Sequence, residues 1–126
     1  MTSSEKKCIL VVDDTPTYIT LLHMILQQKY LVKAAPNGAI ALEIVQKTPA
    51  EINLILLDIM MDGMDGFTVC QTLKENPVTA GIPVVFISGK EEDADRKKGL
   101  SLGAVDFLLK PFSADTVLET AAKYIK

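Results

Sequence analysis

Short apolar runs alternate with longer segments of helical periodicity along the whole chain, and this alternation constrains the fold more than any other feature. Five runs have the composition of β-strands: Cys8–Val12, Leu31–Ala35, Leu54–Leu57, Val84–Ile87 and Val105–Leu109. The first, third and fourth are continuously apolar, which is typical of strands buried on both faces of a parallel sheet. The segments between them place apolar residues three and four positions apart, as helices with one buried face do. Five strand–helix repeats predict an α/β fold, a doubly wound (βα)5 parallel sheet.

Helix boundary signals agree with this pattern. Pro16 suits the first turn of a helix that follows the first strand. Asn37 and Ser113 are residue types that cap helices, and each precedes a helical segment. Gly66 opens a third helical segment that we expect to reach about Glu75.

Length, charge and cysteine content narrow the possible classes of protein. A chain of 126 residues can form one hydrophobic core, so we expect a single domain over residues 1–126, ordered from about residue 7 to residue 125. The 13 Lys and Arg residues and 16 Asp and Glu residues give a net charge of −3, which argues against direct nucleic-acid binding. Apolar stretches are too short to span a membrane, and the first seven residues lack a signal peptide's apolar segment. Cys8 and Cys70 lie in apolar patterns, which predicts buried free thiols and a reducing, cytoplasmic setting.

Polar side chains follow four of the five predicted strands. Asp13 and Asp14 follow the first strand, Asp58 the third, Ser88 the fourth and Lys110 the fifth. In doubly wound sheets, ligands bind beyond the carboxyl ends of the strands. We therefore expect these five residues to meet in one crevice although they are far apart in the sequence.

Three carboxylates in one crevice repel each other, by about 1–4 kcal/mol per pair at effective dielectric constants of 80 down to 20. Either one acid is protonated or a cation joins them. Oxygen ligands without His or Cys favour a hard ion such as Mg²⁺, which also binds phosphate. Lys110 and the Ser88 hydroxyl suit the opposite side of a phosphoryl group. Asp58, at the end of a central strand, is the natural candidate for a carboxylate nucleophile.

Five motifs, in this order, resemble the receiver domain of two-component response regulators, the CheY-like family. They are Val11-Val12-Asp13-Asp14, Leu56-Leu57-Asp58-Ile59-Met60-Met61, Met64-Asp65-Gly66, Pro83-Val84-Val85-Phe86-Ile87-Ser88 and Phe107-Leu108-Leu109-Lys110-Pro111-Phe112. The resemblance covers the chain from about residue 7 to its end. It implies a flavodoxin-like strand order 2-1-3-4-5 in three α/β/α layers. It also implies a signalling switch that is a monomer or a weak homodimer.

The resemblance assigns roles to individual residues. Asp58 resembles the phospho-acceptor, which takes its phosphoryl group from a histidine kinase or a histidine phosphotransfer protein. Asp13 and Asp14, together with Asp58 and the backbone carbonyl of Met60, resemble the ligands of Mg²⁺, for which Mn²⁺ could substitute.

The same resemblance predicts a conformational change after phosphorylation. Ser88 resembles the hydroxyl residue that follows the phosphoryl oxygen, and Lys110 resembles the lysine that pairs with it. Phe107 occupies the aromatic switch position, so the face of the fourth helix, fifth strand and fifth helix is expected to change and control a downstream protein or output domain. The Lys110–Pro111 bond is expected to be cis.

Several positions depart from the commonest family pattern. Asp62 stands where proline is usual, and Phe107 replaces the frequent tyrosine. Met60 and Lys90, two positions beyond the acceptor and the hydroxyl residue, lie where the family varies. We interpret these two as candidates that tune the rate at which water hydrolyses the phosphoryl group.

Three other functions share parts of this pattern. A receiver that lost its phosphorylation chemistry and acts only as a docking module is the main alternative, but the five key positions are all filled. A phosphatase with an aspartyl nucleophile needs an Asp-x-Asp motif, whereas Thr15 and Met60 stand two residues after Asp13 and Asp58. In a flavin mononucleotide binder of the same fold, Asp13 and Asp14 would repel the phosphate.

Overall fold

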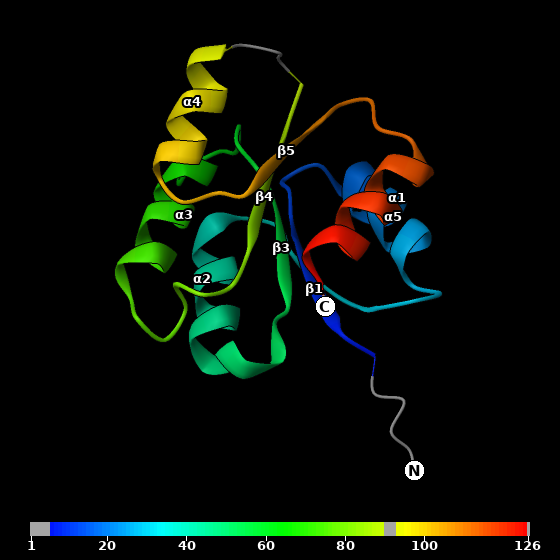
Figure 1. The fold of residues 1–126 in the computed structure, drawn as a ribbon, viewed down its shortest axis with the longest axis horizontal. Helices are drawn as coiled ribbons and strands as arrows, with labels where there is room; N and C mark the ends of the chain where they lie inside the picture. Colours follow the sequence, from blue (N-terminus) through cyan, green and yellow to red (C-terminus); the bar gives the residue numbers. More distant parts are fainter. Residues whose placement is uncertain (1–5, 90–92, 126) are drawn as a thin grey trace.

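The computed structural model describes residues 6–89 and 93–125, in which strands and helices alternate as predicted (Figure 1). The strands are β1 (Cys8–Val12), β2 (Leu31–Ala35), β3 (Leu54–Asp58), β4 (Val84–Ser88) and β5 (Asp106–Leu109). The helices are α1 (Pro16–Leu26), α2 (Gly38–Lys47), α3 (Gly66–Glu75), α4 (Asp93–Ser101) and α5 (Ala114–Tyr124). A short 3₁₀ turn, η1 (Pro49–Glu51), lies between α2 and β3 and was not predicted.

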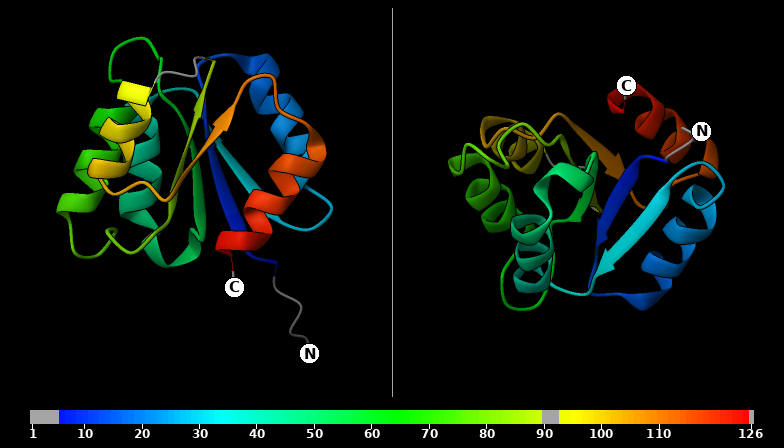
Figure 2. Two further views of the ribbon diagram at one scale, coloured as in Figure 1. Left: turned by 45° about the horizontal axis from the view of Figure 1, so that its top comes forward. Right: turned by 90° about the horizontal axis from the view of Figure 1, so that it is seen from below.

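The five strands form one parallel sheet in the order β2-β1-β3-β4-β5, which confirms the predicted order. Helices α1 and α5 cover one face of the sheet, and α2, α3 and α4 cover the other (Figures 1 and 2). Three layers result. The order places β1 and β3 side by side at the centre, so the ends of these two strands are neighbours.

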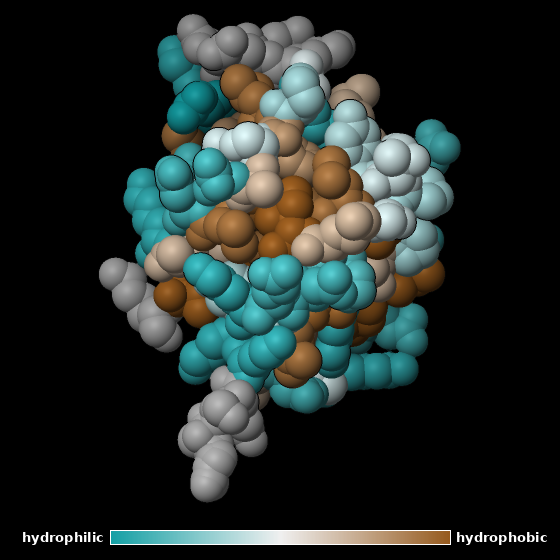
Figure 3. Space-filling view, turned by 90° about the vertical axis from the view of Figure 1, so that its right-hand side faces the viewer, coloured by the Kyte–Doolittle hydropathy of each residue, from teal (hydrophilic) through white to brown (hydrophobic). Residues whose placement is uncertain are grey.

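The apolar runs form the core on both faces of the sheet. All residues of β1, β3 and β4 are buried, as their continuous apolar sequences predicted. Cys8 and Cys70 are buried free thiols, also as predicted. On the outer layer, α1 buries Leu22 and Leu26 but leaves Leu21 and Met24 exposed by 40% and 62%. Figure 3, which looks onto the α1–α5 side, shows an apolar area there bordered by hydrophilic residues.

Strand boundaries differ slightly from the predicted ones at the ends that matter most. β3 and β4 each continue one residue further than predicted. Asp58 still pairs with Ile87 of β4, and Ser88 still pairs with Leu109 of β5. β5 begins at Asp106, one residue later than predicted. The polar end residues Asp58 and Ser88 therefore belong to the strands themselves, which fixes their backbone positions.

Side-chain caps begin three of the helices. The Asn37 side chain accepts a hydrogen bond from the Ile40 N–H at 2.9 Å, and Ser113 Oγ accepts one from the Thr116 N–H at 3.1 Å, so both predicted caps are confirmed. Asp65 caps α3 in the same way, because its Oδ1 accepts a hydrogen bond from the Thr68 N–H at 2.8 Å.

The start of α3 lies against the end of β3. A Cβ atom at Gly66 would overlap the carbonyl oxygen of Asp58, so only glycine allows this approach. Gly63, in the loop between the two elements, has a φ of +81°. These two glycines let the chain turn sharply from the end of β3 into α3.

Candidate functional site

The parallel sheet brings three carboxylates together at the carboxyl ends of β1 and β3. Asp13, Asp14 and Asp58 each offer an oxygen, and these atoms lie within 4.8 Å of one another. Asp13 is fully buried and Asp58 is 4% exposed, whereas Asp14 is exposed. The predicted convergence of these three residues is therefore confirmed.

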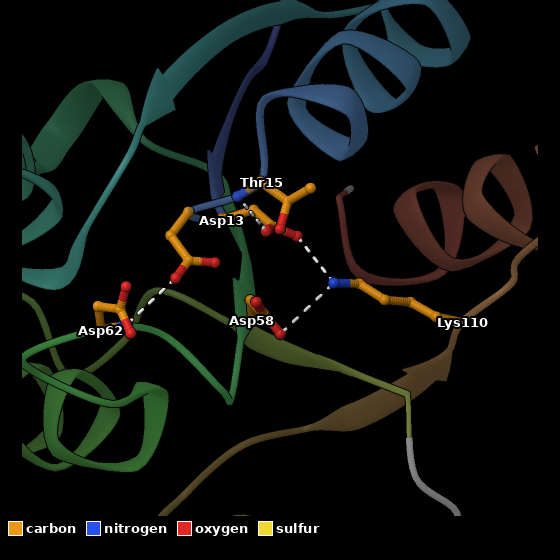
Figure 4. A network of polar contacts seen from close by, with 6 residues as sticks. Asp13, Thr15, Asp58, Asp62 and Lys110 are labelled. Atoms are coloured by element: carbon orange, nitrogen blue, oxygen red, sulfur yellow. Dashed lines mark hydrogen bonds and ion pairs between the residues drawn. The ribbon is translucent and has the colours of Figure 1, made fainter.

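A lysine from β5's end reaches into this cluster (Figure 4). Lys110 Nζ lies 3.0 Å from Asp13 Oδ2 and 3.6 Å from Asp58 Oδ1, and its side chain is only 13% exposed. The sequence analysis placed Lys110 on the opposite side of a phosphoryl group from the acids, but the structure pairs it most closely with Asp13. The ammonium group thus supplies part of the positive charge that crowded carboxylates require.

Backbone N–H groups orient two of the carboxylates. Asp13 Oδ1 accepts a hydrogen bond from the Thr15 N–H at 2.9 Å. Asp14 Oδ2 accepts one from the Asp62 N–H at 3.1 Å, across 48 positions of sequence. Figure 4 shows the labelled partners of these contacts around the acidic cluster. A proline at position 62 would have no N–H to donate, so the Asp14–Asp62 contact depends on this chain's departure from the usual residue.

Burial and the neighbouring acids raise the pKa of Asp58 from 3.8 to about 6. Burial is the largest cause, and the neighbouring Asp13 charge adds to it. Lys110 and the Met60 N–H lower the pKa of Asp58 but do not offset these effects. The cluster places three carboxylates beside the Lys110 ammonium group, and its donors are all oxygens, which is the chemistry that suits Mg²⁺.

Ser88 is the last residue of β4, and Lys110 directly follows the adjacent strand β5. The Lys110 N–H donates to the Ser88 carbonyl oxygen at 2.8 Å, and Ser88 is 3% exposed. The predicted cis bond between Lys110 and Pro111 is present. Both residues therefore lie at the carboxyl ends of the strands, which is the edge of the sheet that carries the acidic cluster.

Phe107 lies on β5 directly opposite Phe86 of β4, and their ring centroids are 5.5 Å apart. Phe107 is partly buried, and its ring borders α4 at Gly99, where a Cβ atom would come within 2.8 Å of ring carbon Cζ. The Arg96 guanidinium lies 5.9 Å from the ring centroid. The ring thus contacts both the sheet and α4.

Of the two predicted rate-tuning residues, Met60 and Lys90, the structure describes only Met60. The Met60 side chain is 66% exposed beyond the end of β3. Lys90 lies outside the described residues. The role of the Met60 carbonyl as a metal ligand stays a prediction.

Sequence reasoning missed the aromatic contact to Lys110. The Tyr18 ring centroid lies 3.9 Å from Lys110 Nζ, and Tyr18 comes from the first turn of α1. The sequence signal was weak, because 92 positions separate the two residues and a tyrosine in an amphipathic helix is ordinary. Its position four residues after Asp14 was the one available hint.

Within the part of the chain that the structure describes, no helix is long and apolar enough to cross a membrane.

Comparisons with known proteins agree with one another. The family model described as "Response regulator receiver domain" matches residues 9–122. A protein named "Probable cyclic di-GMP phosphodiesterase" from Vibrio cholerae is 47% identical over 83% of this chain and 23% of its own length. Response regulator PleD from Caulobacter vibrioides is 48% identical over 82% of this chain and 22% of its own length. The chain thus spans less than a quarter of either relative.

A solved structure has the same fold. The chemotaxis protein CheY4 of Vibrio cholerae superposes with a TM-score of 0.89 at 26% identity, covering 95% of this chain and 99% of that one.

Proposed function

Because this chain belongs to the response regulator receiver domain family, we propose that it is a phosphorylation-dependent signalling switch with Asp58 as its phospho-acceptor. The observation that carries the proposal is the setting of the Asp58 carboxylate. It ends a central strand, lies within 4.8 Å of oxygens of Asp13 and Asp14, and is 3.6 Å from Lys110 Nζ. Such a carboxylate is suited to attack a phosphoryl group whose charge its neighbours offset.

The proposed phosphoryl donor is a phosphohistidine on a histidine kinase or a histidine phosphotransfer protein. One Asp58 oxygen attacks the phosphorus, and the O–P bond forms as the P–N bond breaks and the imidazole leaves. Lys110 and the Ser88 hydroxyl interact with the phosphoryl oxygens. Water later hydrolyses the acyl phosphate, so the chain catalyses only its own phosphorylation and dephosphorylation.

Asp13, Asp14 and Asp58 would hold Mg²⁺ or Mn²⁺, with the Met60 carbonyl as a further ligand. The fit rests on the all-oxygen donor set and on the presence of three carboxylates beside a single ammonium group, that of Lys110. When bound, the ion neutralises charge on the phosphoryl oxygens.

The proposed switch links this chemistry to the α4–β5–α5 face. Ser88 turns toward the new phosphoryl group, and the Phe107 ring moves into the space that this leaves. The contact of the Phe107 ring with α4 at Gly99 supports a coupling between the ring and that helix. Met60 and Lys90 remain candidates for setting how long the phosphoryl group lasts.

The partners follow from this role. We expect a kinase or phosphotransfer protein upstream and a separate protein or joined output domain downstream, with the receiver itself a monomer or weak homodimer. The proposed setting is the cytoplasm, whose reducing conditions suit the free thiols of Cys8 and Cys70.

Labelling with ³²P-acetyl phosphate in Mg²⁺ tests the acceptor. The wild-type chain should take up label in a hydroxylamine-sensitive form, and Asp58→Asn should take up none. Asp115→Asn, which removes an exposed carboxylate on α5, is the matched control and should label as the wild type does. Label in Asp58→Asn would contradict the assignment. A wild-type chain that takes no label, and whose amide NMR signals do not respond to beryllofluoride with Mg²⁺, would instead be a docking module.

A further inference from the structure

The Lys110 ammonium group has three neighbouring side chains, and they come from three different parts of the fold. Asp13 Oδ2 lies at 3.0 Å, Asp58 Oδ1 at 3.6 Å, and the Tyr18 ring centroid at 3.9 Å. With these contacts the Lys110 side chain is only 13% exposed. The ring therefore covers part of the ammonium group that the carboxylates leave open.

Electrostatic attraction to the Tyr18 ring favours a position of the Lys110 ammonium group over the face of the ring. The face of an aromatic ring carries negative charge density and attracts a cation most strongly where water is excluded. The ring does this without being a formal anion, so it adds no further repulsion to the three carboxylates. An additional carboxylate in the same place would increase the crowding of negative charge.

The Tyr18 ring is itself held by contacts independent of Lys110. It lies in the first turn of α1, and its centroid is 6.0 Å from that of Phe112, with the ring planes tilted by 54°. Phe112 follows Lys110 by two residues and packs against the apolar cluster on the α1–α5 side of the sheet. The ring thus connects the start of α1 with the segment between β5 and α5.

We propose that Tyr18 is a positioning residue that keeps the Lys110 ammonium beside Asp58, ready to meet a phosphoryl group there. A four-carbon side chain without this ring would sample positions directed toward solvent and would be held in the site by carboxylates alone. The inference rests on the proposed function, because Lys110 matters only if Asp58 receives a phosphoryl group or its analogue.

Two substitutions at this position separate the ring from the hydroxyl. Tyr18→Leu removes the ring but keeps an apolar helix residue, and Tyr18→Phe keeps the ring but removes the hydroxyl. We expect Tyr18→Leu to weaken beryllofluoride binding in saturating Mg²⁺ by about three- to tenfold, and Tyr18→Phe to restore most of it. Tyr30→Leu is the control, because Tyr30 is also a partly buried tyrosine on the α1–α5 side of the sheet but lies just before β2, at the edge of the sheet opposite β5. It should bind beryllofluoride as the wild type does.

A second readout needs neither phosphorylation nor Mg²⁺. In the wild type the ε-methylene protons of Lys110 should resonate upfield because of the ring current of Tyr18, and this shift should persist in Tyr18→Phe and vanish in Tyr18→Leu. An unshifted Lys110 in the wild type, or beryllofluoride affinity in a folded Tyr18→Leu equal to the wild-type value, would overturn the inference. If the wild type shows the ring-current shift but binds no beryllofluoride, the proposed function fails while the contact stands.

Discussion

The Asp58 carboxylate shows how a single residue can be destabilising in one state and useful in another. Burial and the charge on Asp13 raise its pKa to about 6. At neutral pH the Asp58 side chain is therefore ionised, although the folded structure favours its protonated form more than water does. The same features make the carboxylate responsive to any cation or phosphoryl group that changes the local charge. Stability and chemistry at this residue are therefore opposed.

This opposition predicts a pH dependence of stability in protein freed of divalent cations with EDTA. The folded pKa of Asp58 is about 6 and the unfolded value is 3.8, so between these values the folded state binds more protons. The free energy of unfolding should therefore fall as pH rises from about 4 to about 6, with a contribution from Asp58 of about 1–3 kcal/mol. Urea unfolding at several pH values measures this.

Asp58→Asn should lose most of this slope and be more stable than the wild type at pH 7.5. Glu119→Gln, which removes an exposed carboxylate on α5, should keep the slope. A wild-type stability that rises over this range, with the same profile in Asp58→Asn, would show that Asp58 carries no such penalty.

At the scale of elements, local sequence signals and the strand order they imply predicted the structure well, but individual side-chain contacts between distant residues did not follow from them. The strand Cys8–Val12 and the helix cap Asn37 could be predicted from the sequence, because each depends on residues that are close together in the chain. The convergence of acids at the sheet edge followed from the topology of parallel strands. The pairing of Lys110 with Asp13, across 97 positions, depends on side-chain conformations that periodicity does not encode. The same is true of the Tyr18 ring.

The junction between β3 and α3 predicts the effect of a single methyl group. Gly66→Ala places a Cβ on the carbonyl oxygen of Asp58, and the atoms it meets are all backbone atoms of Asp58 and Ile59, which have little room to adjust. We expect a loss of about 1–3 kcal/mol in the free energy of unfolding. Gly81→Ala is the control, since a Cβ there meets no atom within 4 Å, and it should change stability by less than about 0.5 kcal/mol. Equal stability of the two variants in thermal unfolding would contradict the described approach of α3 to β3.

At the scale of the whole molecule, three strand ends contribute to one cluster, so a ligand at the cluster stabilises the entire sheet. Asp13 comes from beyond β1, Asp58 from β3 and Lys110 from beyond β5. These residues meet only in the folded chain. Any ion that binds there shifts the folding equilibrium by mass action.

Magnesium should therefore raise the melting temperature. At about ten times its dissociation constant, Mg²⁺ should add about 1.4 kcal/mol to the free energy of unfolding, and it should flatten the pH dependence below pH 6 by keeping Asp58 ionised. Differential scanning calorimetry against NaCl of matched ionic strength measures this effect. Asp58→Asn should respond less. A melting temperature that does not change across a Mg²⁺ titration would count against a cation site formed by these carboxylates.

The two ends of the described chain meet the sheet at the edge remote from the acidic cluster. β1 begins there at Cys8, and the Tyr124 hydroxyl at the end of α5 donates to the Val105 carbonyl, just before β5, at 3.2 Å (Figure 2). A fluorophore, an affinity handle or a sensor-chip anchor attached at either end would thus point away from the cluster. Binding assays on immobilised protein can therefore use both attachment sites and should report the same affinities.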